Sequence, residues 1–112
     1  MTVKQLAEQA GLKILAGEDS LGRKIESVYS CDLLSFVMGR APADSAWVTV
    51  MGNVNAMAVA MLADVACVVL AEGAALDDDA KSKAEMNDIA VLWSEKPVFD
   101  AALDIHTRMS GA

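Results

Sequence analysis

Basic side chains are scarce in this sequence of 112 residues, and the few present are scattered. Nine Lys and Arg residues stand against sixteen Asp and Glu residues, which gives a formal net charge of -7. A surface that binds duplex nucleic acid needs clustered cations to displace counterions from the phosphates. The composition therefore disfavours nucleic acid as a partner.

Cysteine and histidine are also rare, since the chain has only Cys31, Cys67 and His106. Both cysteines lie in apolar stretches, which fits a reduced, cytoplasmic protein with buried thiols better than a secreted, disulfide-linked one. A zinc site needs three or four ligands. We therefore expect no metal and no cofactor.

The sequence lacks a signal peptide, a membrane-spanning run and a P-loop. Its first residues are amphipathic, and the apolar run 56–70 is too short to cross a bilayer and is broken by Asp64. Residues 17–24 have P-loop glycine spacing, but Arg23 and Lys24 stand where Lys and then Ser or Thr are required. We expect no membrane partner, and an enzyme is hard to assemble from this chain.

Apolar residues, in contrast, are abundant. They make up 54% of the chain, and the mean hydropathy is +0.35. This length suits one domain with a sizeable core. Because surplus apolar surface is most simply covered by a second copy, we expect a homodimer.

The residue pattern alternates between expected strands and helices. The expected strands are 12–16, 24–29, 46–51, 67–70 and 89–93, and the expected helices are 2–10, 33–40, 56–66, 80–87 and 97–109. Such alternation predicts an α/β fold, a single domain with a mostly parallel sheet flanked by helices.

Local signals place several helix ends and faces. Thr2 and Gly11 bound the first helix, and Asp32 is expected to cap the second. The helix 56–66 is apolar on almost every face, so we expect it to be buried on more than one side, with Met57 and Met61 filling the core.

Ligands of open parallel sheets bind beyond the carboxyl ends of the strands. In this chain those ends are predicted at residues 30–32, 52–55, 72–73 and 94–96. The candidate ligand-binding residues are Asp32, Ser35, Gly52, Asn53, Asn55, Glu72 and Gly73.

Each candidate also has a structural interpretation. Gly52 and Asn53 could offer backbone N–H groups to a phosphate or carboxylate, or Asn53 or Asn55 could simply cap the helix. Asp32 and Ser35 could serve a ligand or only the start of a helix. Glu72 could bind a ribose hydroxyl or a cation, or be solvated.

Cys31 is the one candidate nucleophile, because a helix N-terminus lowers the pKa of a thiol. No histidine lies near it in sequence to act as a base. His106 falls on a helix face with Phe99, Ala102 and Leu103, and we expect it to be a packed residue rather than a ligand.

Residues 29–38, 45–50 and 63–70, with the turns at Gly52 and at Glu72–Gly73, resemble the DRTGG domain family. The resemblance extends to the first helix and to residues 14–17 and 21–24, and it suggests one DRTGG-like domain over residues 1–112. That family is similar in fold to the N-terminal domain of HPr kinase/phosphorylase. In this chain Gly52-Asn53-Val54 replaces the family's Gly-Asp-Arg, and Ala71-Glu72-Gly73 replaces its Thr-Gly-Gly.

The resemblance implies a regulatory role, because such domains occur beside CBS domains and at the front of some phosphotransacetylases. It also implies a bacterial protein with a protein partner in redox or acetate metabolism. The leading hypothesis is a stand-alone, non-catalytic domain that senses a ligand or binds a protein. The alternatives are a nucleotide- or anion-binding protein that uses the Gly52 and Glu72 turns, and an enzyme that uses Cys31.

Overall fold

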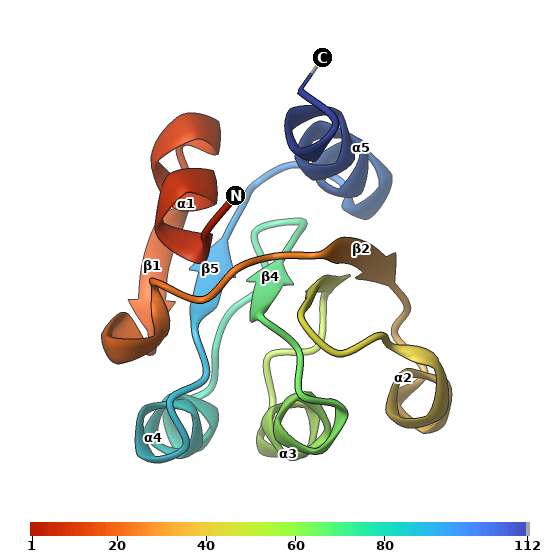
Figure 1. Cartoon of the computed structure of the whole chain (residues 1–112). Coiled ribbons are helices and arrows are strands. Elements are labelled where there is room, and N and C mark those ends of the chain that lie inside the picture. The colour runs from red at the N-terminus through yellow and green to blue at the C-terminus, as the bar shows by residue number, and fades with distance from the viewer. Residues whose placement is uncertain (112) are drawn as a thin grey trace.

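In the computed structural model, which describes residues 1–111, a sheet lies between two layers of helices (Figure 1). The strands are β1 (Lys13–Ala16), β2 (Ser27–Ser30), β3 (Ser45–Thr49), β4 (Cys67–Leu70) and β5 (Val91–Trp93). The helices are α1 (Val3–Ala10), α2 (Leu34–Arg40), α3 (Val54–Ala63), α4 (Asp78–Met86) and α5 (Val98–Met109), with a 3-10 turn at Glu18–Ser20. Helices α2, α3 and α4 cover one face of the sheet, and α1 and α5 cover the other.

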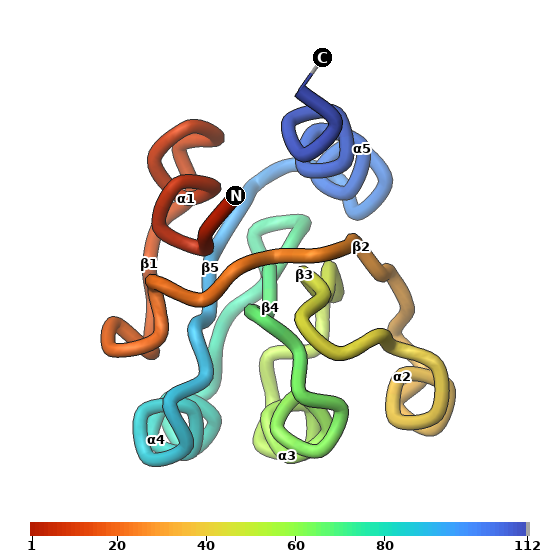
Figure 2. The backbone as a smooth tube through the Cα atoms, in the orientation of Figure 1, coloured from red at the N-terminus to blue at the C-terminus, as the bar shows by residue number. Residues whose placement is uncertain are grey.

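The strand order is β1-β5-β4-β3-β2. Strands β2 to β5 are mutually parallel, and β1 runs antiparallel to β5 at one edge of the sheet. Because consecutive parallel strands are neighbours, α2, α3 and α4 lie in a row along one face (Figure 2). The predicted fold class, an α/β domain with a mostly parallel sheet flanked by helices, is confirmed.

Strand β4 divides its side chains between two cores. Cys67 and Val69 are buried with α1 and α5, whereas Val68 and Leu70 are buried with α3 and α4. This alternation follows from the two-residue period of a strand. A strand covered on both faces must be apolar throughout, as residues 67–70 are.

Helix α1 begins and ends where the sequence predicts. The Thr2 hydroxyl accepts a hydrogen bond from Gln5 N at 3.1 Å, and Gln5 Oε1 accepts one from Thr2 N at 2.9 Å. Gly11 follows the helix with φ of 66°, a left-handed conformation that glycine adopts at low cost.

The amino ends of the parallel strands are held together by Arg23. Its guanidinium donates to the Asp44 carboxylate at 2.7 Å and to the Asp64 carboxylate at 2.9 Å. Burial by itself lowers the pKa of Arg23, but the hydrogen bonds to Asp44 and Asp64 outweigh it and raise this pKa above its ordinary value. The charge of Arg23 therefore holds the loops before β3 and β4.

Two predicted boundaries at β2 and α2 are wrong. The strand begins at Ser27 rather than at residue 24, because Lys24 pairs only with Thr2 and Glu26 N donates to Asp44 O at 2.8 Å. Asp32 does not cap α2, since the helix begins after Leu33, which makes no side-chain capping hydrogen bond.

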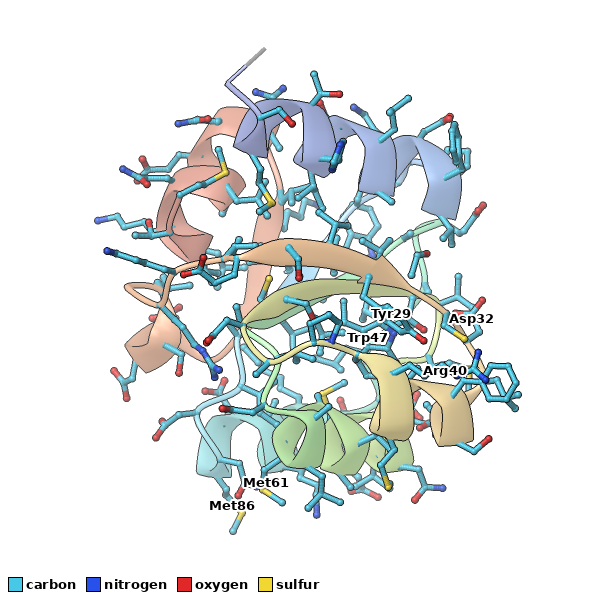
Figure 3. The ribbon with its side chains drawn as sticks, turned by 45° about the vertical axis from the view of Figure 1, so that its right-hand side comes forward. Tyr29, Asp32, Arg40, Trp47, Met61 and Met86 are labelled. Carbon is cyan, nitrogen blue, oxygen red and sulfur yellow. The ribbon has the colours of Figure 1, made fainter. Side chains whose placement is uncertain are left out.

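Helix α3 packs under the sheet and contacts α2 and α4 on its flanks, but its outer face is exposed, so the prediction that Met61 fills the core is wrong. It spans Val54–Ala63 rather than residues 56–66, because Asn53 caps its start and Asp64, with a left-handed φ of 58°, terminates it. Met57 is fully buried as predicted, but Met61 is 42% exposed and Leu62 is 65% exposed. In Figure 3 Met61 lies at the outer surface of the helix layer.

The packed face of α5 also differs from the prediction. Ala101 and Ile105 are buried against the sheet, whereas Phe99, Leu103 and His106 are exposed. His106 is therefore a surface residue of this helix and not a core histidine.

Candidate functional site

The predicted turns come together along one edge of the sheet, which we call the carboxyl-end edge. The last residues of β2, β3, β4 and β5 all lie there because these strands are parallel. The start of the antiparallel β1 joins them, since Lys13 pairs with Trp93 at the end of β5. Ligands of open α/β sheets bind at this edge.

Asp32 ties the end of β2 to the end of β3. Its Oδ1 accepts hydrogen bonds from Thr49 Oγ1 at 2.7 Å and from Val50 N at 3.1 Å. The Thr49 side chain is fully buried, so this contact satisfies a hydroxyl that water does not reach. Ser35, the other candidate near α2, is exposed on the first turn of the helix.

Asn53 caps helix α3, one of the two interpretations that the sequence left open. Its Oδ1 accepts from Ala56 N at 2.8 Å, whereas Asn55 is exposed in the first turn. A Cβ atom at Gly52 would lie 2.0 Å from Ala75 O, so this position must be glycine for the loop before α4 to approach β3. Gly52 O also accepts from Asp77 N at 2.9 Å.

Glu72 joins the end of β4 to the start of α5. Its Oε2 accepts a hydrogen bond from Val98 N at 2.9 Å, which satisfies one free N–H of the helix and places a negative charge at its N-terminus. Gly73, with φ of 68°, donates from its N to Ser94 O at 2.9 Å. The Glu72–Gly73 turn is therefore connected to the turn after β5.

Cys31 follows the end of β2 and is half-buried. Its carbonyl accepts from Trp47 Nε1 at 2.9 Å, and Figure 3 shows Trp47, Tyr29 and Asp32 together at this end of the sheet. His106, the only histidine, lines a separate pocket of about 380 Å³ with Glu26 at the opposite end of β2. The structure thus does not bring Cys31 and His106 together.

Two other ionisable side chains near these elements are perturbed by burial. Burial raises the pKa of the Cys67 thiol to about 12, which keeps this cysteine protonated and unreactive. Partial burial raises the pKa of the Tyr29 hydroxyl as well, and the neighbouring Cys31 thiol adds to the effect.

A hollow that the sequence did not suggest lies at the other end of the carboxyl-end edge. It has a volume of about 390 Å³, and its lining includes Leu15, Leu76, Asp78 and Lys81 as well as Lys13 and Trp93. We call it the Lys13–Trp93 pocket. The Lys13 ammonium lies 4.8 Å from the centroid of the Trp93 ring. A second pocket of about 330 Å³, lined by Gly11 and Glu95 among others, shares Lys13 and Trp93 with it.

The seven predicted site residues do not line this pocket, which is formed by residues missed in the sequence. Lys13 and Trp93 are distant in the chain, and only the antiparallel pairing of β1 with β5 brings them together. One feature of the sequence could have indicated the pocket. Trp93 is the last residue of an expected strand, and the carboxyl end of a parallel strand is where ligands bind.

Residues 1–111 contain neither a metal-binding cluster nor a helix that could span a membrane. In that part of the chain, no group of three His, Cys, Asp or Glu side chains is arranged to hold a metal ion. None of the helices described there has the length and apolar character that a bilayer crossing requires.

Comparison with known proteins gives a fold relationship. No protein-family model matches the sequence, and no curated protein matches it. A crystal structure of the regulatory region of Clostridium perfringens pyrophosphatase is similar, with a TM-score of 0.73 and 11% sequence identity over 91% of this chain. That structure contains CBS and DRTGG domains in complex with the activator diadenosine tetraphosphate, and this chain spans 44% of its length.

Proposed function

We propose that this chain forms a non-catalytic regulatory domain of the DRTGG type over residues 1–112, which senses a ligand or binds a protein partner. Two observations support the proposal. Its fold is similar to part of a regulatory region that contains a DRTGG domain. Its sequence also resembles the DRTGG pattern, although Asn53 and Glu72 replace signature residues.

The observation that carries the proposal is how the polar side chains of the carboxyl-end edge are used. Asp32, Asn53 and Glu72 each accept backbone hydrogen bonds, and these bonds join strand ends to one another or to helices. Side chains held in this way position secondary structure, which favours a structural role over a catalytic one for Asp32, Asn53 and Glu72.

The proposed regulatory domain acts as a homodimer. Helices α2 and α3 carry an outer apolar surface, which we define as the exposed residues Leu33, Phe36, Met38, Val54, Met61 and Leu62. The two helices are in contact, so these side chains belong to one layer of the molecule. Contiguous exposed apolar residues mark interaction surfaces in soluble proteins.

By the family resemblance, a protein partner would belong to redox or acetate metabolism in a bacterial cytoplasm.

Size-exclusion chromatography with light scattering tests the dimer. We expect the wild type to be dimeric and Leu62→Glu to be monomeric, because a charge in an apolar interface is costly. Phe99→Glu is the matched control, since Phe99 is also a highly exposed apolar residue but lies on α5, across the sheet. A wild type that is monomeric at high concentration would contradict this part of the proposal.

A second candidate function is binding of a nucleotide or another small anion at the carboxyl-end edge. It is favoured by the Lys13–Trp93 pocket, and the regulatory region that is similar in fold binds the activator diadenosine tetraphosphate. Thermal-shift measurements against a panel of nucleotides test it. The variants Asn53→Ala and Glu72→Ala show whether the nucleotide-dependent thermal shift depends on the Gly52–Glu72 side of the edge or on the pocket. The absence of any nucleotide-dependent shift in the wild type would count against ligand sensing.

A further inference from the structure

The Lys13–Trp93 pocket brings basic side chains and an indole ring together at the carboxyl-end edge. Its lining includes two basic residues, Lys13 and Lys81, the half-buried Trp93 and one acidic residue, Asp78. Its volume of about 390 Å³ is at the small end of the range for ligand sites, about 300–1,000 Å³. The occupant that fits is one small molecule with an aromatic ring and a negative charge.

We propose that this pocket binds a nucleoside monophosphate. The base stacks on the Trp93 indole, the phosphate binds Lys13 and Lys81, and Asp78 accepts a hydrogen bond from a hydroxyl or amino group. The proposal rests on the ligand-sensing form of the proposed function and places the ligand away from Gly52 and Glu72.

The charges of the pocket are available to a ligand. Across residues 1–111, ion pairs within 4.0 Å involve Arg23, Lys96 and Arg108, and neither Lys13 nor Lys81 is among them. An incoming phosphate therefore gains two cationic partners without breaking an ion pair. In a chain with a net charge of -7, a lining with two cations and one carboxylate is a local positive site.

The indole of Trp93 provides the surface for the ring. Trp47, by comparison, is fully buried and donates its N–H to Cys31 O, so its ring packs in the core and cannot stack on a ligand. Trp93 closes the end of β5 and borders the pocket, with the Lys13 ammonium 4.8 Å from its ring centroid. Stacking of a nucleobase on an aromatic side chain is favourable for every base. Because the Lys13 ammonium lies over a face of this ring, it moves aside as the base stacks there and then contacts the phosphate of the same ligand.

Isothermal titration calorimetry of the full chain with AMP, GMP, CMP and UMP tests the proposal. We expect saturable binding of at least one of them with a dissociation constant at or below about 1 mM. Adenosine and inorganic phosphate, which each lack one half of the ligand, should bind at least tenfold more weakly, as expected from loss of a charged hydrogen bond or of a stacking contact.

Variants of exposed lysines locate the site without affecting the fold. Lys13→Gln and Lys81→Gln should each weaken binding about tenfold. Lys24→Gln is the control, because Lys24 is also exposed but lies before β2, away from the pocket. Nucleotide binding that is unchanged in both pocket variants would overturn this site while leaving ligand sensing intact. Failure of all four nucleotides at about 1 mM would overturn this proposal and the nucleotide form of the proposed function together.

Discussion

The two ends of the carboxyl-end edge differ in what their polar side chains do. At the ends of β2, β3 and β4, Asp32, Asn53 and Glu72 accept hydrogen bonds from the chain itself, and we call this the closed half. At the end of β5 and the start of β1, Lys13 and Trp93 border a pocket, and we call this the open half. The same topological edge thus contains a structural part and a part available to ligands.

The difference shows why a polar residue at a strand end is a weak sign of a site. Asn53 and Glu72 satisfy N–H groups that the first turn of a helix leaves without partners. Lys13 has no such task, because in residues 1–111 its ammonium forms no ion pair and lies over the face of the Trp93 ring. Four substitutions, taken in order of expected effect, test the comparison.

Gly52→Ala should disrupt the closed half most strongly. The new Cβ would lie 2.0 Å from Ala75 O, so the loop before α4 would have to move. We expect the free energy of unfolding, measured by urea denaturation, to fall by about 3 kcal/mol or more. Gly39→Ala is the control, since a Cβ there meets no atom within 4 Å and α2 should gain about 0.5–1 kcal/mol. Equal effects of the two substitutions would contradict the close packing at Gly52.

Asp32→Ala should have the next largest effect. The buried Thr49 hydroxyl and Val50 N would both lose their acceptor, at a cost of about 2 kcal/mol in unfolding free energy. Asp32→Asn retains an Oδ1 acceptor and should lose less than half of that amount. If both variants unfold at the wild-type urea concentration, Asp32 is not a structural tie.

Glu72→Ala should cost about 1 kcal/mol, the usual value of a lost cap at a helix N-terminus. The reason is that Val98 N, at the start of α5, loses its acceptor. Glu95→Ala is the matched control for an exposed glutamate nearby, and it should stay within about 0.5 kcal/mol of the wild type. Both variants are measured by chemical denaturation. Equal losses of unfolding free energy in Glu72→Ala and Glu95→Ala would contradict the role of Glu72 as a cap.

Lys13→Gln should change stability least, by about 0.5 kcal/mol, because an exposed cation–π contact contributes little. The thermal midpoint should therefore remain close to that of the wild type while nucleotide binding weakens. A loss of stability as large as that of Asp32→Ala would mean that the open half is structural too.

The sequence predicts the fold better than it predicts the site. Thr2, Gly11 and the apolar residues 67–70 act within their own segments, so local rules place them correctly. The function of Asp32 depends on Thr49, and that of Glu72 depends on Val98, in other elements of the chain. Met61 and His106 are exposed because the sheet covers only one side of α3 and of α5, which helical periodicity cannot specify when several faces are apolar.

The open half could not be predicted for a similar reason. Lys13 and Trp93 meet only because β1 is added antiparallel to β5 at the edge of an otherwise parallel sheet. The sequence pattern gives the existence of β1 but not its position or direction. A pocket between the first and last strands of a chain therefore becomes visible only in the folded structure.

A titration followed by ¹⁵N NMR tests the central claim most directly. The wild-type protein is titrated with AMP while three reporters are monitored: the Trp93 indole N–H and the backbone amides of Ala56 and Val98, which donate to Asn53 and Glu72. We predict that the Trp93 signal shifts with ligand concentration and that the signals of Ala56 and Val98 stay in place. Shifts at Ala56 and Val98 with an unchanged Trp93 signal would contradict the division of the edge into a closed and an open half.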